Sequence, residues 1–163
     1  MTKLNWQALL FVPAGAPRFV ASAIRHRPDA VILDLEDAVA PSDKAKAREA
    51  LRGHQQELAA AGIPVVLRVN SSLAAMVRDI AAADMDRLAA VVVPKCSSTR
   101  GLENAAELLD AEPPVPLIAL IEQPSALPRV NAIASVPRVA GLMFGPEDYA
   151  AGLGTEPSSP ALE

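Results

Sequence analysis

Six short apolar runs recur along the chain, and they constrain its fold more than any other feature. Each is five or six residues long and nearly continuous in apolar side chains, rather than apolar at every second position. A strand of this kind needs cover on both faces, as in a parallel sheet flanked by helices. We therefore predict six buried strands, at residues 8–12, 30–35, 65–69, 89–93, 116–121 and 139–144.

Helical segments alternate with these runs. Proline favours the first turn of a helix, so a helix is predicted from Pro17 to about Arg25, and a second should occupy 43–61 and stop at Gly62. Three more are predicted at 73–83, 101–111 and 125–134. Such alternation predicts right-handed β-α-β units, arranged either as a doubly wound sheet or as a (β/α)8 barrel.

Charged residues that follow the strands decide between these two folds. Arg68, Lys95, Glu122 and Asp148 are separated by 27, 27 and 26 residues, about one β-α unit each. In a barrel the strand ends converge on one rim, so these side chains would surround one substrate. We predict an α/β fold of the (β/α)8 TIM-barrel type, with about the first six units in residues 1–154. Residues 155–163, rich in Pro and Ser, are expected to be a tail or a truncation point.

Composition favours a small-molecule partner. The net charge is -4 without a dense basic block, which argues against binding nucleic acid or an acidic membrane. No signal peptide or run of about 20 apolar residues is present, so we expect a cytoplasmic protein without a membrane partner. The single Cys96 excludes an internal disulfide. His26 and His54 fall among polar neighbours and are expected on the surface.

Glu122 and Asp148 are the first candidates for chemistry. Two carboxylates from neighbouring strand ends can chelate a hard cation such as Mg²⁺ and leave positions for water and ligand oxygens. The alternative is that they only cap helices or solvate the strand ends.

Arg68 ends the stretch "PVVLR". A guanidinium at a buried strand end can bind a carboxylate through two hydrogen bonds or stabilise an enolate oxygen. A structural pair with Glu36 or Asp37 is an equal alternative. Asp34 lies within an apolar run and needs partners there, so it is interpreted as structural. Glu36 and Asp37 are candidates to lie near metal-bound water.

Two further cations border the predicted rim. Lys95 could act as an electrophile or as a Schiff-base amine, but an ion pair with a rim carboxylate is favoured. Arg18 stands at a helix start after "LFVPAGAP", where it and backbone N–H groups could receive a phosphate.

Six motifs occur together in one order: "LFVPAGAPRF", "AVILDLEDAVAPSDKAKAR", "VVLRVN", "VVVPK", "PLIALIE" and "VAGLMFGPEDYAAGLG". With them the chain resembles the citrate lyase beta subunit family over nearly all of its length. The wider group includes malyl-CoA and citramalyl-CoA lyases and the HpcH/HpaI aldolases. The resemblance implies a magnesium-dependent enzyme on a (β/α)8 barrel that cleaves or forms carbon–carbon bonds.

The resemblance also implies roles for individual residues. Glu122 and Asp148 would bind Mg²⁺, and Arg68, together with Glu122, would contact the substrate carboxylate or thioester carbonyl. Glu36 and Asp37 would orient metal-bound water. Arg18 would lie near the phosphates of coenzyme A. Glu147 would orient its neighbours.

The sequence departs from the family pattern at several points. Ala14 replaces a usual glycine, no glutamate follows Lys95, and "EQPSAL" replaces a stretch that usually reads Glu-Thr-Ala. Strands seven and eight, and a C-terminal acid that reaches a neighbouring subunit, have no counterpart. The main hypothesis is a lyase that cleaves a citryl-, malyl- or citramalyl-CoA thioester to an acyl-CoA and a 2-oxo acid. An aldolase acting on free 2-oxo acids and a catalytically silent partial-barrel subunit stay open. We also expect a homo-oligomer, with a trimer as one candidate.

Overall fold

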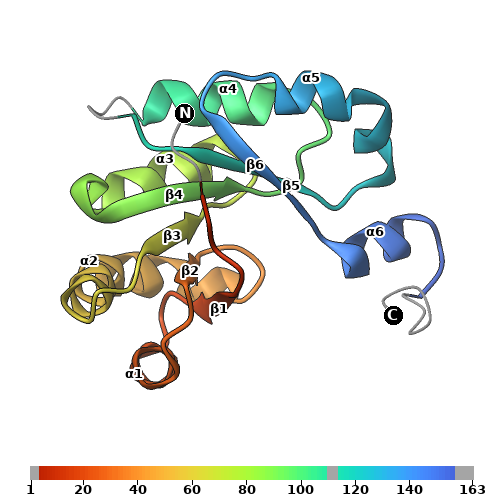
Figure 1. Cartoon of the computed structure of the whole chain (residues 1–163). Helices are drawn as coiled ribbons and strands as arrows, with labels where there is room; N and C mark the ends of the chain where they lie inside the picture. The colour runs from red at the N-terminus through yellow and green to blue at the C-terminus, as the bar shows by residue number, and fades with distance from the viewer. Residues whose placement is uncertain (1–3, 110–113, 157–163) are drawn as a thin grey trace.

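The computed structural model describes residues 4–109 and 114–156, which form one parallel sheet with its strands in chain order (Figure 1). The strands are β1 (Leu9–Pro13), β2 (Ala30–Asp34), β3 (Val65–Arg68), β4 (Leu88–Val93), β5 (Leu117–Ile121) and β6 (Val139–Phe144). A doubly wound sheet would reverse its strand order at a switch point. The uninterrupted order β1 to β6 therefore confirms the predicted barrel-type winding. The sheet is open, because β1 and β6 do not pair with each other in the described part of the chain.

Helices follow the strands as predicted, with one addition. They are α1 (Pro17–His26), α2 (Lys44–Ala60), α3 (Leu73–Ala82), α4 (Arg100–Leu108), α5 (Val130–Ala134) and α6 (Pro146–Gly152). The helix predicted at 125–134 is instead a 3-10 segment, Pro124–Arg129, followed by the short α5. Pro128, inside this segment, lacks the N–H that the interior of an α-helix needs. Helix α6 was not predicted.

The two faces of the sheet are covered differently. The larger apolar cluster joins strand residues such as Leu33 and Leu67 to the helices, through Leu51 and Leu102 among others. The smaller cluster lies on the opposite face and consists of strand side chains, with Leu4, Trp6, Leu9 and Met143 packed against it. Helices on one face and mainly strand side chains on the other are typical of the outside and inside of a barrel wall.

The outer strands are less buried than the sequence predicted. All five residues of β2 and of β5 are buried. By contrast Leu10 and Phe11 in β1 are 40% and 42% exposed, and Leu142 and Phe144 in β6 are 46% and 56% exposed. Each outer strand has a neighbour on one side only. The prediction of full burial was thus right for β2 and β5, nearly right for β3 and β4, whose ends are half-buried, and wrong for the outer two strands.

Two other expectations concern the C-terminal tail and membrane-spanning helices. Most of the predicted tail, 157–163, lies outside the described residues, and residues 155–156 are exposed. None of the helices in the described part of the chain combines the length and the apolar character needed to cross a membrane.

Candidate active site

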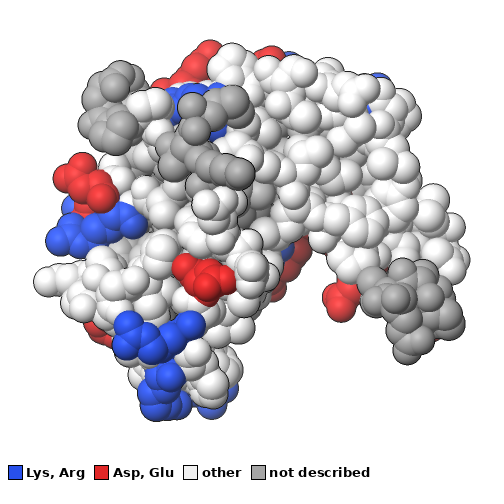
Figure 2. Space-filling view, in the orientation of Figure 1, with Lys and Arg blue, Asp and Glu red and all other residues white. Residues whose placement is uncertain are grey.

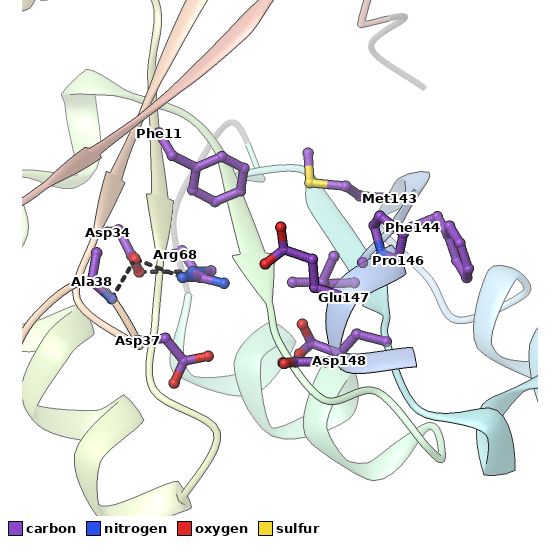
Figure 3. A pocket seen from close by; sticks show the side chains of 13 residues that line it. Phe11, Asp34, Asp37, Ala38, Arg68, Met143, Phe144, Pro146, Glu147 and Asp148 are labelled. Atoms are coloured by element: carbon purple, nitrogen blue, oxygen red, sulfur yellow. Dashed lines mark hydrogen bonds and ion pairs between the residues drawn. The ribbon is translucent and has the colours of Figure 1, made fainter. Parts of the chain in front are cut away.

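A cavity of about 500 Å³ opens at the carboxyl ends of the strands (Figure 3). Its lining comes from five of the six strands or the segments that follow them: Phe11, Asp34, Asp37, Ala38, Arg68, Leu120, Glu122, Met143, Phe144, Gly145, Pro146, Glu147 and Asp148. A second cavity of about 470 Å³ shares three of these residues, Asp37, Glu122 and Asp148, and adds Lys95. In Figure 2 acidic atoms lie on both sides of the hollow between the main body and α6.

Arg68 is fixed by the acid beside it in the sheet. Asp34 and Arg68 are register partners on β2 and β3. Arg68 donates to the two carboxylate oxygens of Asp34 at 2.7 Å from Nε and 2.6 Å from Nη2. Asp34 also accepts the amides of Glu36 and Ala38 at 2.8 and 3.0 Å. Asp34 is therefore a fully satisfied buried acid, which agrees with its structural interpretation.

The guanidinium keeps donors free for a ligand. Arginine has five N–H donors, and Asp34 takes two of them. Nη1 lies 3.3 Å from Glu36 Oε2, and the ring of Phe11 lies 5.0 Å from the guanidinium carbon. Burial acts to lower the pKa of Arg68, but the bonds to Asp34 and the charges of Glu36 and Asp37 raise it. Arg68 is thus a fixed cation at the cavity wall. Its main partner is Asp34, not the Glu36 or Asp37 considered from sequence.

Lys95 forms the expected ion pair. Its Nζ lies 2.7 Å from Oε1 of the buried Glu36 and 3.5 Å from Oδ1 of Asp37. The hydrogen bond to Glu36 raises the pKa of Lys95, which keeps the amine protonated. A Schiff-base lysine needs a lowered pKa, so this geometry favours the ion pair. Burial raises the pKa of Glu36, and Lys95 and Arg68 oppose that shift.

The two candidate metal ligands lie on the opposite side of the same cavity. Glu122 is 3% exposed, and its Oε1 accepts the backbone N–H of Lys95 at 2.6 Å. Burial raises the pKa of Glu122, and the negative charges of Glu36 and Asp148 raise it further. Asp148 is exposed in the first turn of α6 and lines both cavities together with Glu122.

Gly145 lets the turn before α6 approach Glu122. A Cβ at position 145 would lie 2.7 Å from the Cβ of Glu122, closer than side chains pack. The Gly145 amide donates to the carbonyl of Ile121, the residue before Glu122, at 2.9 Å. The glycine therefore brings the first turn of α6, with Glu147 and Asp148, beside the end of β5.

Sequence reasoning missed a lysine that holds the acidic turn after β2. Lys44 Nζ donates to the carbonyls of Leu35 and Glu36, both at 2.6 Å, and to Asn70 Oδ1 at 2.8 Å. Asn70 in turn donates to the Leu35 carbonyl and to Oδ2 of the fully buried Asp79. Nothing in the stretch "SDKAKAR" distinguishes Lys44 from its charged neighbours.

The predicted phosphate role of Arg18 stays a prediction, and the predicted placement of one histidine differs from the structure. Arg18 is exposed on α1, with its guanidinium carbon 4.5 Å from the centre of the Phe19 ring, and is not among the residues that line the cavity. The prediction that both histidines lie on the surface was right for His26 and wrong for His54. His54 is 5% exposed and its Nδ1 lies 2.7 Å from the Ala14 carbonyl, because α2 turns this side chain towards the first β-α turn.

Residues 7–163 match the model of the HpcH/HpaI aldolase/citrate lyase family. The chain belongs to this family. Its curated relatives include a citrate lyase subunit beta-like protein of Deinococcus radiodurans, 33% identical over 96% of this chain and 57% of the relative. A (3S)-malyl-CoA thioesterase of Cereibacter sphaeroides is 36% identical over 89% of this chain and 50% of its own length. The chain thus spans little more than half of the curated relatives it matches.

Solved structures of the family superpose on the same fold. A citrate lyase beta subunit of Mycobacterium tuberculosis complexed with oxaloacetate and magnesium is 32% identical, with a TM-score of 0.72 over 92% of this chain and 64% of that protein. A complex of the protein CitE from the same organism with magnesium, acetoacetate and coenzyme A is 31% identical, with a TM-score of 0.72 over 93% and 53%.

The donor set of the cavity fits a hard divalent cation. Five acids, Asp34, Asp37, Glu122, Glu147 and Asp148, and one base, Arg68, line it. Since Asp34 pairs with Arg68, four acids lack an arginine partner within this lining. Among the described residues no three His, Cys, Asp or Glu side chains gather into a ready metal cluster. Mg²⁺ usually takes one or two carboxylates and keeps several waters, so Glu122 and Asp148 would be enough to hold it.

Proposed function

We propose that this chain carries the metal and oxo-acid site of a magnesium-dependent carbon–carbon lyase. Its substrate would be a hydroxyacyl-CoA thioester of the citryl-, malyl- or citramalyl-CoA type, cleaved to an acyl-CoA and a 2-oxo acid. The observation that carries the proposal is the shared cavity of Arg68, Glu122 and Asp148. Two family structures support it, since those proteins are complexed with magnesium and with oxaloacetate or acetoacetate.

Charge at the cavity explains why a cation is part of the proposal. An anionic oxo acid would be repelled by the acids that Arg68 does not neutralise. Glu122 and Asp148 would hold Mg²⁺, and Glu36 and Asp37 would orient water bound to it. When bound, Mg²⁺ supplies Lewis acidity at the hydroxyl or oxo oxygen of the ligand. A bound cation also favours the ionised form of Glu122, whose pKa burial otherwise raises.

Arg68 is the group that would bind and stabilise the substrate. In the cleavage the hydroxyl loses its proton, its oxygen becomes the new carbonyl, and the electrons of the broken carbon–carbon bond pass to the carbon alpha to the thioester and onto the thioester carbonyl oxygen. The resulting enolate gains a proton at carbon to give the acyl-CoA. A guanidinium already fixed by Asp34 can donate to a carboxylate or to the enolate oxygen without reorganising.

A panel of acyl-CoA thioesters, tested with and without Mg²⁺, examines the proposal directly. Lyase activity releases a 2-oxo acid and an acyl-CoA, whereas a thioesterase releases free coenzyme A thiol. The panel therefore separates the two activities named among the relatives. Binding of coenzyme A by calorimetry separates a CoA-dependent lyase from an aldolase on free oxo acids.

The metal part has its own test. We expect Glu122→Gln and Asp148→Asn each to lower the Mg²⁺ affinity by about 100-fold or more, because each removes one of two charged ligands. Unchanged Mg²⁺ binding in the double variant would contradict the proposal. A catalytically silent subunit that assembles through the exposed apolar residues of β1 and β6 is the second candidate. Turnover by this chain purified alone would exclude that second candidate.

A further inference from the structure

Lys95 follows β4 and contacts acids that belong to two other strand ends. Its backbone N–H donates to Glu122 Oε1 at 2.6 Å, and its Nζ lies 2.7 Å from Glu36 Oε1. Glu36 follows β2, and Glu122 follows β5. A single residue thus links the turn after β2, which carries Glu36, to the end of β5, which carries the candidate metal ligand Glu122.

The backbone of Lys95 is in the left-handed region, with φ 53°. For a residue with a Cβ this conformation is disfavoured by a factor of roughly 5 to 30 in population. The other described residues of this kind are Arg27 and Arg138, with φ 50° and 73°. Arg27 ends α1, where its amide closes the last turn on Ala23, so its conformation has a local cause. At Lys95 the left-handed conformation accompanies an N–H directed at a buried carboxylate.

We propose that Lys95 is a positioning residue whose left-handed backbone aims the carboxylate of Glu122, and whose ion pair with Glu36 compensates for the unfavourable conformation. The inference rests on the proposed function, since it explains how that metal site is assembled. Without the ion pair, a side-chain-bearing residue at 95 relaxes towards negative φ and turns its N–H away from Glu122. Only a fraction of the molecules then has the arrangement that binds the metal. The apparent Mg²⁺ affinity falls in proportion to that fraction.

Glycine and alanine at position 95 separate the backbone from the side chain. Both Lys95→Gly and Lys95→Ala remove the ammonium, but only glycine adopts positive φ without cost. Titration calorimetry with Mg²⁺ alone should give Lys95→Gly an affinity within about threefold of the wild type, and Lys95→Ala an affinity about tenfold weaker than Lys95→Gly. Lys95→Met should resemble Lys95→Ala, because it keeps the Cβ and loses the charge.

Arg27 offers a matched control away from the cavity. Arg27→Gly and Arg27→Ala make the same comparison at a left-handed residue, and both should bind Mg²⁺ like the wild type, although their melting temperatures differ. Equal Mg²⁺ affinities of Lys95→Gly and Lys95→Ala, or wild-type affinity in Lys95→Met, would overturn the inference and leave the proposed function standing. An affinity difference in the Arg27 pair as large as that at position 95 would also overturn it. A wild type that binds no Mg²⁺ would overturn both.

Discussion

On the β2–β3 side of the cavity Asp34 is fully buried and accepts four hydrogen bonds, whereas on the β6 side Asp148 is exposed in the first turn of α6. The first side is assembled by the protein itself, since Arg68 is fixed whether or not a ligand is bound. The second side presents acids without such a partner, so a bound cation would complete it. The cavity therefore combines a preorganised guanidinium, that of Arg68, with carboxylates that a bound cation would neutralise.

The largest expected effect comes from breaking the anchored side at Asp34. Asp34→Asn keeps the volume but leaves the Arg68 charge without its partner, so we expect the free energy of unfolding to fall by about 3 kcal/mol. Urea unfolding followed by circular dichroism measures this. Asp148→Asn is the matched variant on the exposed side and should change stability by less than about 0.5 kcal/mol. Equal losses in the two variants would contradict the contrast between the sides.

Lys44 tests whether the anchored side depends on residues outside the cavity. Lys44→Met removes three hydrogen bonds to the turn that carries Glu36, and we expect a loss of about 2 kcal/mol. Hydrogen exchange should become faster at the amides of Glu36 and Ala38 and stay unchanged in α6. Lys46→Met, on the same helix with an exposed side chain, is the control. Faster exchange in α6 as well would indicate a global effect.

Two glycines, Gly141 in β6 and Gly145 just after it, test the contact between the turn before α6 and the end of β5. Gly145→Ala places a Cβ against that of Glu122, so we expect a loss of about 1 to 2 kcal/mol and weaker Mg²⁺ binding, because Glu122 must shift. At Gly141 an added Cβ meets nothing within 4 Å, so Gly141→Ala should be neutral or slightly stabilising. Thermal melting and Mg²⁺ calorimetry on both variants measure these effects. If Gly145→Ala kept wild-type Mg²⁺ affinity, the close approach would not matter for the site.

The smallest effect concerns Cys96, next to Lys95 and 3% exposed. Burial raises the pKa of the Cys96 thiol from 9.0 to about 12. Between these values the unfolded chain loses the thiol proton while the folded protein keeps it, so stability falls as pH rises above about 9. The wild type should lose about 1 kcal/mol more than Cys96→Ala between pH 8 and pH 10. Identical pH profiles of unfolding for the two proteins would show that Cys96 does not contribute.

The same contrast separates what could be predicted from what could not. The strands followed from apolar runs, because a parallel strand buried on both faces is recognisable in its local sequence. The barrel-type winding followed from the regular spacing of the charged residues after the strands. The convergence of Arg68, Glu122 and Asp148 on one cavity followed from their spacing. Helix α6 and the 3-10 form of 124–129 were missed, since short helical turns have weak local signals. Lys44 was missed and the burial of His54 was misjudged, because the burial of a polar side chain depends on which element packs against it.

By itself the sequence determined the number of strands, their parallel order and the rim on which the charged residues meet, because these follow from chain-local patterns repeated once per β-α unit. The tertiary structure alone decided the pairing of Arg68 with Asp34, the close approach of Gly145 to Glu122 and the left-handed conformation of Lys95. Each of these features depends on a contact between residues more than twenty positions apart, which for Lys95 is the hydrogen bond to Glu122. Their hydrogen bonds and contacts form only when separate strands are packed, and no local pattern specifies which of several nearby acids a buried cation will select.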